Sequence, residues 1–182
     1  MKKVKVVYEV YRFKELNREA KDKAIANWYE KEDYPFLEEQ LTESCKALLE
    51  AAKIKGDPAL GYSLSYSQGD GLNFTGEFEW RKYRITVTHS WRYPFASASE
   101  ITLSNEEGGE IISESAKILP KFNASKESKL FNRFAKIYLG ICFKLEREGY
   151  ATLEYRMNDK EFAEHCQANN YNFFKDGRMI NL

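Results

Sequence analysis

The chain has no long apolar run, and this absence excludes a membrane-spanning helix. No stretch approaches the roughly 18 consecutive apolar residues that such a helix needs. The opening residues, MKKVKVVYEVYRF, are basic but alternate between apolar and polar side chains without an apolar core. This pattern favours a strand over a signal peptide. We therefore expect no membrane partner.

Cysteine is scarce, and neither sign of charge is in excess. Cys45, Cys142 and Cys166 form an odd, widely spaced set, which is not a disulfide framework and is typical of a reducing cytosol. Lys and Arg number 28, as do Asp and Glu, so the net charge is zero. Zero net charge argues against nucleic-acid binding driven by the field of the whole protein, but it leaves a local patch open. We expect a cytoplasmic protein.

The short motifs of common enzyme and metal sites are missing. The sequence has no Walker A loop, no G-x-G-x-x-G, no G-x-S-x-G, no C-x-x-C and no H-x-x-x-H. His165 and Cys166 are adjacent, and neighbouring side chains on a helix diverge by about 100°. We therefore expect no metal and no cofactor. A Ser-His-Asp or Cys-His triad depends on spatial proximity, so the sequence leaves it open.

Hydrophobic periodicity predicts a strand and two helices in the first third of the chain. Apolar and polar residues alternate over residues 3–12, which predicts a strand. Asn17 suits the N-cap of a first helix. A second helix begins near Pro35 and ends before Gly56-Asp57-Pro58. Its expected buried face consists of Leu37, Leu41, Cys45, Leu48 and Ala52.

The middle of the chain changes to a period of two residues. Four alternating runs are joined by short turns, which predicts an antiparallel meander. The runs lie within residues 60–66, 72–80, 83–91 and 99–103, and a short strand is expected over 110–113. Aromatic residues make up 15% of the chain, and Tyr and Phe suit half-buried sheets and contact surfaces.

The last third predicts a long helix, a short helix and a hairpin. The long helix begins near Ser125, and it either ends at Gly149 or continues to Tyr155 at a cost of about 1 kcal/mol for the interior glycine. Asn158-Asp159-Lys160-Glu161 has the form of a capping box at the start of the short helix. Asp176-Gly177 predicts the hairpin. The expected buried face of the long helix consists of Leu130, Phe134, Ile137, Ile141 and Leu145.

Together these elements predict an α+β fold. The strands come in a run and do not alternate strictly with helices, which favours α+β over a doubly wound sheet. We expect residues 1–182 to form a single α+β domain in which helices pack on one face of an antiparallel meander sheet. A chain of this length buries about 70% of its unfolded surface, enough for a core without disulfides or metals.

The loop Gln68-Gly69-Asp70-Gly71 is the first candidate site. Gly69 and Gly71 can take a positive φ without steric cost, so the simplest interpretation is a hairpin turn. The same glycines would let a ligand or partner approach the backbone, and successive N–H groups could hold an anion. Asp70 would repel a phosphate unless it is paired or metal-bound, so the two functional interpretations conflict.

The segment HSWRY, residues 89–93, is the second candidate site. His89 falls on the apolar face of its predicted strand, where a histidine is more often structural than catalytic. Trp91 and Arg92 follow, and the segment offers stacking faces, a cation and a titratable ring. Such a set would suit a nucleotide or a protein hot spot.

Two carboxylates are predicted on one side of the sheet. Glu77 and Glu79 alternate with Phe78 and Trp80, so both point to the same face. A solvated outer face is the simplest interpretation. A pair of carboxylates could also serve acid–base chemistry or bind a cation, which would require Asp70 or His89 nearby.

Five segments resemble a family of bacteriophage and prophage proteins with a central S-Q-G-D-G signature. The segments are YRFKELNREAKDKAIANWY, SLSYSQGDGLNFTG, ITVTHS, KLEREGYATLEYRMNDKEF and NNYNFFKDGRMI. Family members are mostly labelled hypothetical phage proteins, and some are labelled antitoxins. The resemblance implies a location in the bacterial host cell but no known reaction. Gln68, Asp70 and His89 match its recognisable positions, and Gly149 departs from the polar residue expected there.

A binding protein is the favoured hypothesis, and an enzyme is the less favoured one. The protein would occlude a host protein such as a defence factor or a toxin, with anchors on the loop and on the aromatic segment. The candidate binding residues are Tyr66, Gln68, Gly69, Asp70, Gly71, His89, Trp91 and Arg92.

Two alternatives remain open from the sequence. The first is a hydrolase or sequestering protein directed at a nucleotide or nucleic acid. In it, His89 is the general acid or base, Asp70 and Glu77 are its carboxylate partners, and the three converge in one cleft. The second is a homodimer in which exposed aromatic residues form the self-interface.

Overall fold

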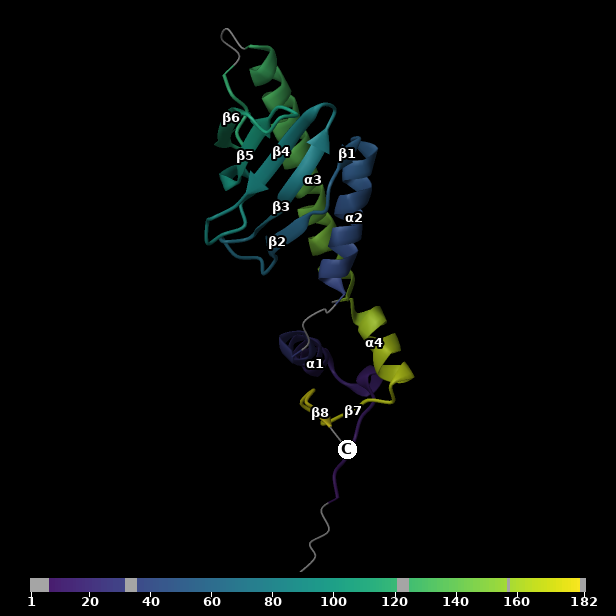
Figure 1. The fold of residues 1–182 in the computed structure, drawn as a ribbon. Coiled ribbons are helices and arrows are strands. Elements are labelled where there is room, and N and C mark those ends of the chain that lie inside the picture. The colour runs from purple at the N-terminus through teal and green to yellow at the C-terminus, as the bar shows by residue number, and fades with distance from the viewer. Residues whose placement is uncertain (1–6, 32–35, 121–124, 157, 181–182) are drawn as a thin grey trace, which may run out of the picture. The chain divides into compact units, whose positions relative to one another are not determined.

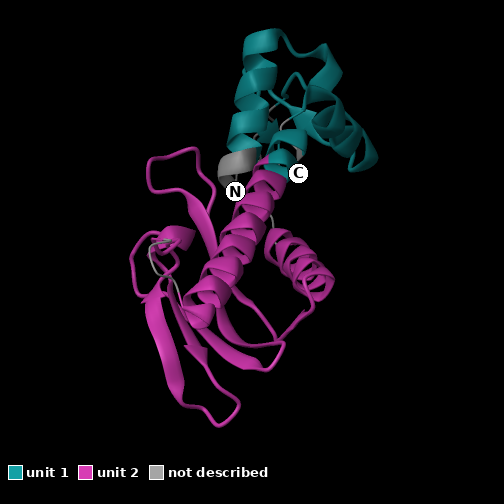
Figure 2. Cartoon of the chain, turned by 90° about the horizontal axis from the view of Figure 1, so that it is seen from above, with its two compact units in different colours: residues 1–34, 151–182 teal, residues 35–150 magenta. Residues whose placement is uncertain are grey.

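A computed structural model describes residues 7–31, 36–120, 125–156 and 158–180 (Figure 1). Within these residues the chain has four α-helices and a six-stranded antiparallel sheet, which confirms the predicted α+β class. The chain divides into two compact units, unit 1 (residues 1–34 and 151–182) and unit 2 (residues 35–150), coloured separately in Figure 2. That the two units fold as one domain stays a prediction.

The sheet of unit 2 is built around its longest strand, β3 (Gly71–Trp80). On one side of it follow β4 (Tyr83–Thr88), β5 (Glu100–Ser104) and the edge strand β6 (Glu110–Ser115), each antiparallel to the one before. This order confirms the predicted meander. One difference matters for the site: β4 ends at Thr88, so the segment from residue 89 onward forms a loop and not the end of a strand.

The other side of β3 is covered by one interrupted strand. β1 (Ile54–Lys55) pairs with the last residues of β3, and β2 (Ala59–Ser63) pairs with its first residues. Both pairings keep the same register, so β1 and β2 are two parts of one strand broken at Gly56-Asp57-Pro58. Proline lacks the N–H that a continuous ladder would need, which explains the break.

Helix α2 (Leu37–Ala51) and the part of helix α3 (Lys126–Arg156) that belongs to unit 2 lie side by side on one face of this sheet (Figure 1). The Phe74 ring lies 4.7 Å from that of Tyr138, and the Trp80 ring lies 5.8 Å from that of Phe134. Ser44 in α2 also donates a hydrogen bond of 2.7 Å to a carboxylate of α3. The predicted packing of helices on one face is therefore confirmed for α2 and α3.

The buried faces of both helices are rotated slightly from the predicted ones. In α2, Leu49 is buried and Leu48 is half-buried, because the face follows a strict spacing of four residues. In α3, Leu130 and Ile137 are half-buried. The residues of α3 that are buried in unit 2 include Phe131, Phe134, Ala135, Tyr138, Ile141, Cys142 and Leu145. The large side chains of Phe131 and Tyr138, each one position further along the helix, are buried in place of Leu130 and Ile137.

The α3 helix continues through Gly149, which decides between the two predicted ends. Gly149 is buried, and a Cβ there would collide with a methyl group of Leu64, the residue that follows β2. Gly140 in the same helix has open space where its Cβ would be. The glycine at 149 therefore accommodates packing against the loop and does not mark a helix end.

Unit 1 has a small core of its own. It contains the 3₁₀ helix η1 (Phe13–Glu15), helix α1 (Arg18–Lys31), helix α4 (Asp159–Ala168) and the hairpin of β7 (Asn172–Phe173) and β8 (Met179–Ile180). The buried residues are Phe13, Leu16, Ala20, Ala24, Phe162, Cys166 and Phe173.

Local signals set the ends of these elements. The side chain of Asn17 accepts a hydrogen bond of 2.8 Å from the N–H of Ala20, which confirms the predicted cap of α1. The hairpin around Asp176-Gly177 also forms, with a φ of 87° at the glycine. The predicted start of the second helix at Pro35 lies outside the described residues.

Two predictions for unit 1 fail, the strand over its described residues and the capping box in part. Residues 7–10 form no strand, and Tyr11 makes only a single antiparallel bridge to Phe173; residues 3–6 lie outside the described part. The alternating side chains there are largely exposed, so they have no sheet to pack on. The capping box forms only by half. Asn158 caps the N–H of Lys160, but Glu161 accepts a hydrogen bond of 2.6 Å from the hydroxyl of Tyr155 instead.

Alanine at the two glycines of α3 should have different effects. Ala is a better helix former than Gly by about 1 kcal/mol, so we expect G140A to stabilise unit 2. In G149A the new methyl group displaces Leu64, and this overpacking offsets the helix gain. Urea unfolding should place G149A about 1–2 kcal/mol below G140A in free energy of unfolding. Equal stabilisation by both substitutions would show that Leu64 does not pack on Gly149.

Candidate functional site

The loop between β2 and β3 is organised around the carboxylate of Asp70. The hydroxyls of three alternating serines donate hydrogen bonds to Oδ1: Ser63 at 3.1 Å, Ser65 at 2.8 Å and Ser67 at 2.9 Å. The backbone N–H groups of Ser65 and Ser67 donate to Oδ2 at 2.7 and 3.1 Å. The predicted turn is present as well, because the N–H of Asp70 donates to the carbonyl of Ser67. One side chain thus closes the whole loop.

A sixth hydrogen bond connects this loop to α3. The hydroxyl of Tyr150 donates to Oδ2 of Asp70 at 2.5 Å. Burial on its own raises the pKa of Asp70, but the hydrogen bonds from Tyr150, Ser65 and Ser67 outweigh it and hold that pKa far below its usual range. Burial and the bond to Asp70 raise the pKa of Tyr150 to about 12.

These contacts determine what Asp70 can do chemically. A carboxylate has about four acceptor sites, and six donors already occupy those of Asp70. A carboxylate with so low a pKa is also a poor general base near neutral pH. Asp70 therefore positions the loop, and its acceptor sites are already taken by donors from the protein.

The glycines of the loop have a role that differs from the predicted one. Neither Gly69 nor Gly71 has a positive φ; in this loop that conformation belongs to Tyr66, at 59°. A Cβ at Gly69 would lie 2.7 Å from the ring of Tyr93, and one at Gly71 would lie 2.9 Å from the carbonyl oxygen of Pro94. The glycines therefore allow residues 64–71 to pack closely against residues 89–95.

His89 is held at the base of this second loop by a chain of hydrogen bonds. Its Nε2 lies 2.9 Å from the carbonyl oxygen of Tyr93, and its Nδ1 lies 3.0 Å from Oγ of Ser99. A carbonyl only accepts, so Nε2 carries a proton and donates to it; in the neutral tautomer Nδ1 then accepts from the serine. The hydroxyl of Tyr138, in α3, donates to the same Oγ at 2.7 Å. The chain therefore fixes the loop to the helix layer.

The Ser99–His89 pair has the spacing of a nucleophile and its base, but not the access. Ser99 is fully buried, so no substrate can reach its hydroxyl. Burial is the main cause that raises the pKa of the neighbouring Tyr138 hydroxyl, which stays protonated and keeps donating to Ser99. This arrangement is typical of a structural histidine, the simpler of the two interpretations of His89.

Several exposed side chains lie on the two loops. Trp91 is 63% exposed, Tyr66 is 58% exposed and Tyr93 is 43% exposed. The ring of Tyr66 lies 4.8 Å from that of Tyr150, and the guanidinium of Arg92 lies 5.7 Å from the centre of the Tyr93 ring. We name these the two-loop surface, which consists of Tyr66, Gln68, Trp91, Arg92 and Tyr93.

Glu77 is not part of this surface. It lies on the outer face of the sheet, paired across strands with Thr86, and Glu79 is paired with Arg84 and Lys55. Both glutamates are exposed and line a cavity of about 240 Å³ that neither His89 nor Asp70 reaches. Six residues of extended chain, 71–76, separate Glu77 from Asp70, which corresponds to about 20 Å. The side chains of the hydrolase hypothesis therefore do not line one cleft.

The structural residues of the site were not predicted, although one signal for them is visible. Ser63, Ser65 and Ser67 alternate directly before the loop, so their hydroxyls fall on one side of an extended chain. This alternation could have predicted that a nearby acidic residue, Asp70, accepts hydrogen bonds from those hydroxyls. Tyr150 contributes from a segment 80 residues away and Ser99 from beyond the second loop, and no local pattern indicates either contact.

Comparison of the chain with protein-family models, with curated proteins and with solved structures finds no match. Across the described ranges, no group of three or more His, Cys, Asp or Glu side chains is arranged to hold a metal ion. No helix in the same ranges combines the length and apolar character needed to cross a membrane. The geometry of the two loops is therefore the main basis for a functional proposal.

D70N should destabilise unit 2 in a way that depends on pH. The amide accepts fewer hydrogen bonds than the carboxylate, so we expect a loss of about 1–3 kcal/mol in free energy of unfolding at neutral pH. The pKa of Asp70 is lower in the folded state than its unfolded value of about 3.9, so its contribution is complete above that value.

As pH falls below about 4, protonation removes this contribution, and the difference between wild type and D70N should shrink. Urea unfolding from pH 7 down to pH 3 measures it. D22N, which changes an exposed aspartate of α1, is the matched control. A difference that does not vary with pH would show that the Asp70 carboxylate is not the source of the stability.

Proposed function

We propose that this chain is a binding protein that docks on a folded protein partner through the two-loop surface. The observation that carries the proposal is a set of exposed aromatic side chains and an arginine on loops that are fixed from beneath. Tyr, Trp and Arg are the residues most enriched at binding hot spots. Loops that are already ordered lose less conformational entropy when a partner binds.

The mechanism that fits these residues is occlusion. The acceptor sites of the Asp70 carboxylate are occupied, both nitrogens of His89 have partners, and the Ser99 hydroxyl is buried. Asp70 and His89, two of the groups that would do chemistry in the hydrolase alternative, therefore support the loops instead. Such a surface would act by covering a functional face of its partner.

The resemblance of the S-Q-G-D-G loop region to phage and prophage proteins supports a choice of partner. We propose a host protein, such as a defence factor or a toxin, in the cytoplasm of a bacterial cell. In a protein of this kind the supporting residues of the loops and the exposed residues have separate tasks. The first set maintains the fold of the surface, and the second set makes the contact.

Native mass spectrometry tests the proposal. Tagged chain is captured gently from a bacterial lysate, and a co-purifying protein of fixed stoichiometry is expected. W91A/R92A should weaken its binding about 30-fold, because hot-spot residues contribute about 2 kcal/mol or more. The matched control is F143A/R147A, which removes another exposed aromatic residue and an arginine lying 5.8 Å from its ring.

Other outcomes would contradict the proposal. A retained mass of nucleotide size, lost in W91A/R92A, would favour the nucleotide alternative, since aromatic faces with an arginine also suit base stacking. A mass of two chains that W91A/R92A converts to one would favour the homodimer. Equal partner binding by W91A/R92A and F143A/R147A would place the interface elsewhere on the chain.

A further inference from the structure

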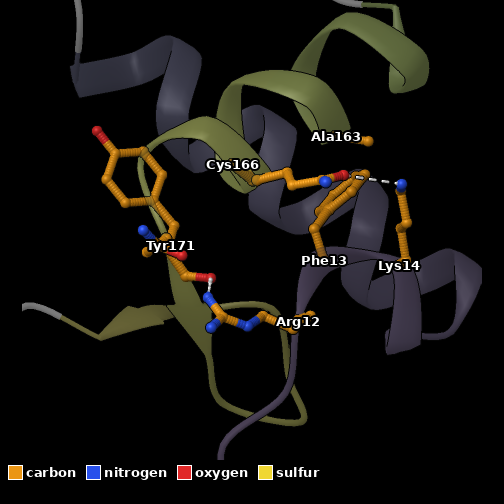
Figure 3. Close-up of a pocket in the computed structure, with 8 residues that line it drawn as sticks. Arg12, Phe13, Lys14, Ala163, Cys166 and Tyr171 are labelled. Atoms are coloured by element: carbon orange, nitrogen blue, oxygen red, sulfur yellow. Dashed lines mark hydrogen bonds between the residues drawn. The ribbon is translucent and has the colours of Figure 1, made fainter.

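Unit 1 contains a cavity of about 250 Å³ that shares no residue with the two-loop surface (Figure 3). Its apolar part is formed by the ring of Phe13, the thiol of Cys166 and the methyl group of Ala163. Phe13 and Cys166 also belong to the core of the unit, so this wall is fixed by packing. The cavity therefore offers a preformed apolar surface.

Two cations stand beside this apolar surface. Lys14 Nζ donates to Oε1 of Gln167 at 3.1 Å, and Arg12 Nη1 donates to the carbonyl oxygen of Tyr171 at 3.4 Å. Figure 3 shows these two side chains reaching to different sides of Phe13. Both acceptors are neutral, and the longer bond is weak. Each cation can therefore turn to a stronger acceptor at little cost.

The positive charge at the cavity is not balanced by an ion pair. Among the residues that the structure describes, neither Arg12 nor Lys14 lies within 4.0 Å of a carboxylate oxygen in a salt bridge. The carboxylate of Glu15 is used differently, because it accepts a hydrogen bond of 2.6 Å from the backbone N–H of Arg12 at the start of η1. An anion in the cavity would meet two side chains that prefer charged acceptors.

We propose that this cavity binds a small organic anion, with a ring-sized apolar body against Phe13 and a carboxylate or phosphate group held by Arg12 and Lys14. The size is suitable, because a cavity of about 150 Å³ is enough for benzene. The remaining volume leaves space for one anionic group. This site is independent of the proposed function, which concerns residues of unit 2.

The cavity binds its ligand without reacting with it. Burial raises the pKa of the Cys166 thiol to about 12, so the sulfur is protonated at neutral pH and is a poor nucleophile. The other polar side chains that line the cavity are two cations, two amides and the phenol of Tyr171, which can orient an anion by hydrogen bonds. Reversible binding of an intact ligand is therefore the expected behaviour.

Titration of the full chain, followed by NMR and calorimetry, tests this site. The probes are benzoate, phenyl phosphate, benzyl alcohol and inorganic phosphate. We expect saturable binding of benzoate or phenyl phosphate, and about tenfold weaker binding of the alcohol and of inorganic phosphate, which each lack one half of the recognised group. The stronger of the two anions then identifies the headgroup as a carboxylate or a phosphate.

Variants locate the binding. R12Q/K14Q should weaken it about tenfold or more, and A163L should abolish it by filling the cavity while keeping both charges. K160Q, which removes an exposed charge from α4, should have no effect. If A163L does not fold, K14Q alone serves, because Lys14 is exposed.

Three results would overturn the proposal. One is no saturable binding of any probe. Another is binding that is unchanged in R12Q/K14Q, or in K14Q when that variant stands alone. The third is inorganic phosphate that binds as tightly as phenyl phosphate, which would mean that the apolar wall takes no part. None of these results would bear on the two-loop surface.

Discussion

The carboxylate of Asp70 is the interaction on which the candidate site depends. It collects hydrogen bonds from alternating serines of one loop and from Tyr150 of the long helix, so a polar segment becomes part of the folded unit. Without these hydrogen bonds, the polar groups of the loop would bind water, and the gain in conformational entropy would favour a disordered loop. Tyr66 keeps a positive φ at the tip of the same loop, a conformation that needs such support.

The second loop depends on the first and on a network of its own. Gly69 and Gly71 let the two loops approach each other, and the chain from Tyr138 through Ser99 to His89 fixes the second loop from below. Polar groups in these networks are fully used, which stabilises the loops but removes their chemical reactivity. A surface of this kind is suited to binding. The separate cavity of unit 1 has the opposite character, since within the described residues the side chains of its two cations donate to neutral acceptors.

The fold was predictable wherever a local pattern also determined the packing. The meander followed from side chains that alternate around Phe74 and Phe78, and the cap of α1 followed from Asn17. The predictions failed where distant residues decide the outcome. Residues 7–10 alternate like a strand but pair with no other strand in the described part of the chain, and only the next residue, Tyr11, forms a bridge, to Phe173. Gly149 resembles a helix end, but the absence of a side chain there makes room for Leu64.

For the candidate site, the sequence predicted which residues belong to it but not the role that each of them has. Asp70 and His89 were predicted as candidate site residues, but their partners lie in other segments: Tyr150 is 80 residues from Asp70, and Ser99 is 10 residues from His89. Unless those partners are known, a carboxylate or an imidazole cannot be assigned either a structural role or a catalytic one. Trp91 and Arg92 were predicted as anchors, and their position on a loop follows from the end of β4 at Thr88. His89, the residue directly after that end, is hydrogen-bonded to the buried Ser99, a contact that no local pattern shows.

Amide hydrogen exchange of residues 64–70 tests whether the two-loop surface is preformed around Asp70. The N–H groups of Ser65 and Ser67 donate to the Asp70 carboxylate, although both serines are exposed. We expect these two amides to exchange at least about tenfold more slowly than those of an exposed loop without such bonds, even in the absence of a partner. Exchange of both at the rate of an unstructured peptide would contradict this expectation, because the loop would then be ordered only on binding.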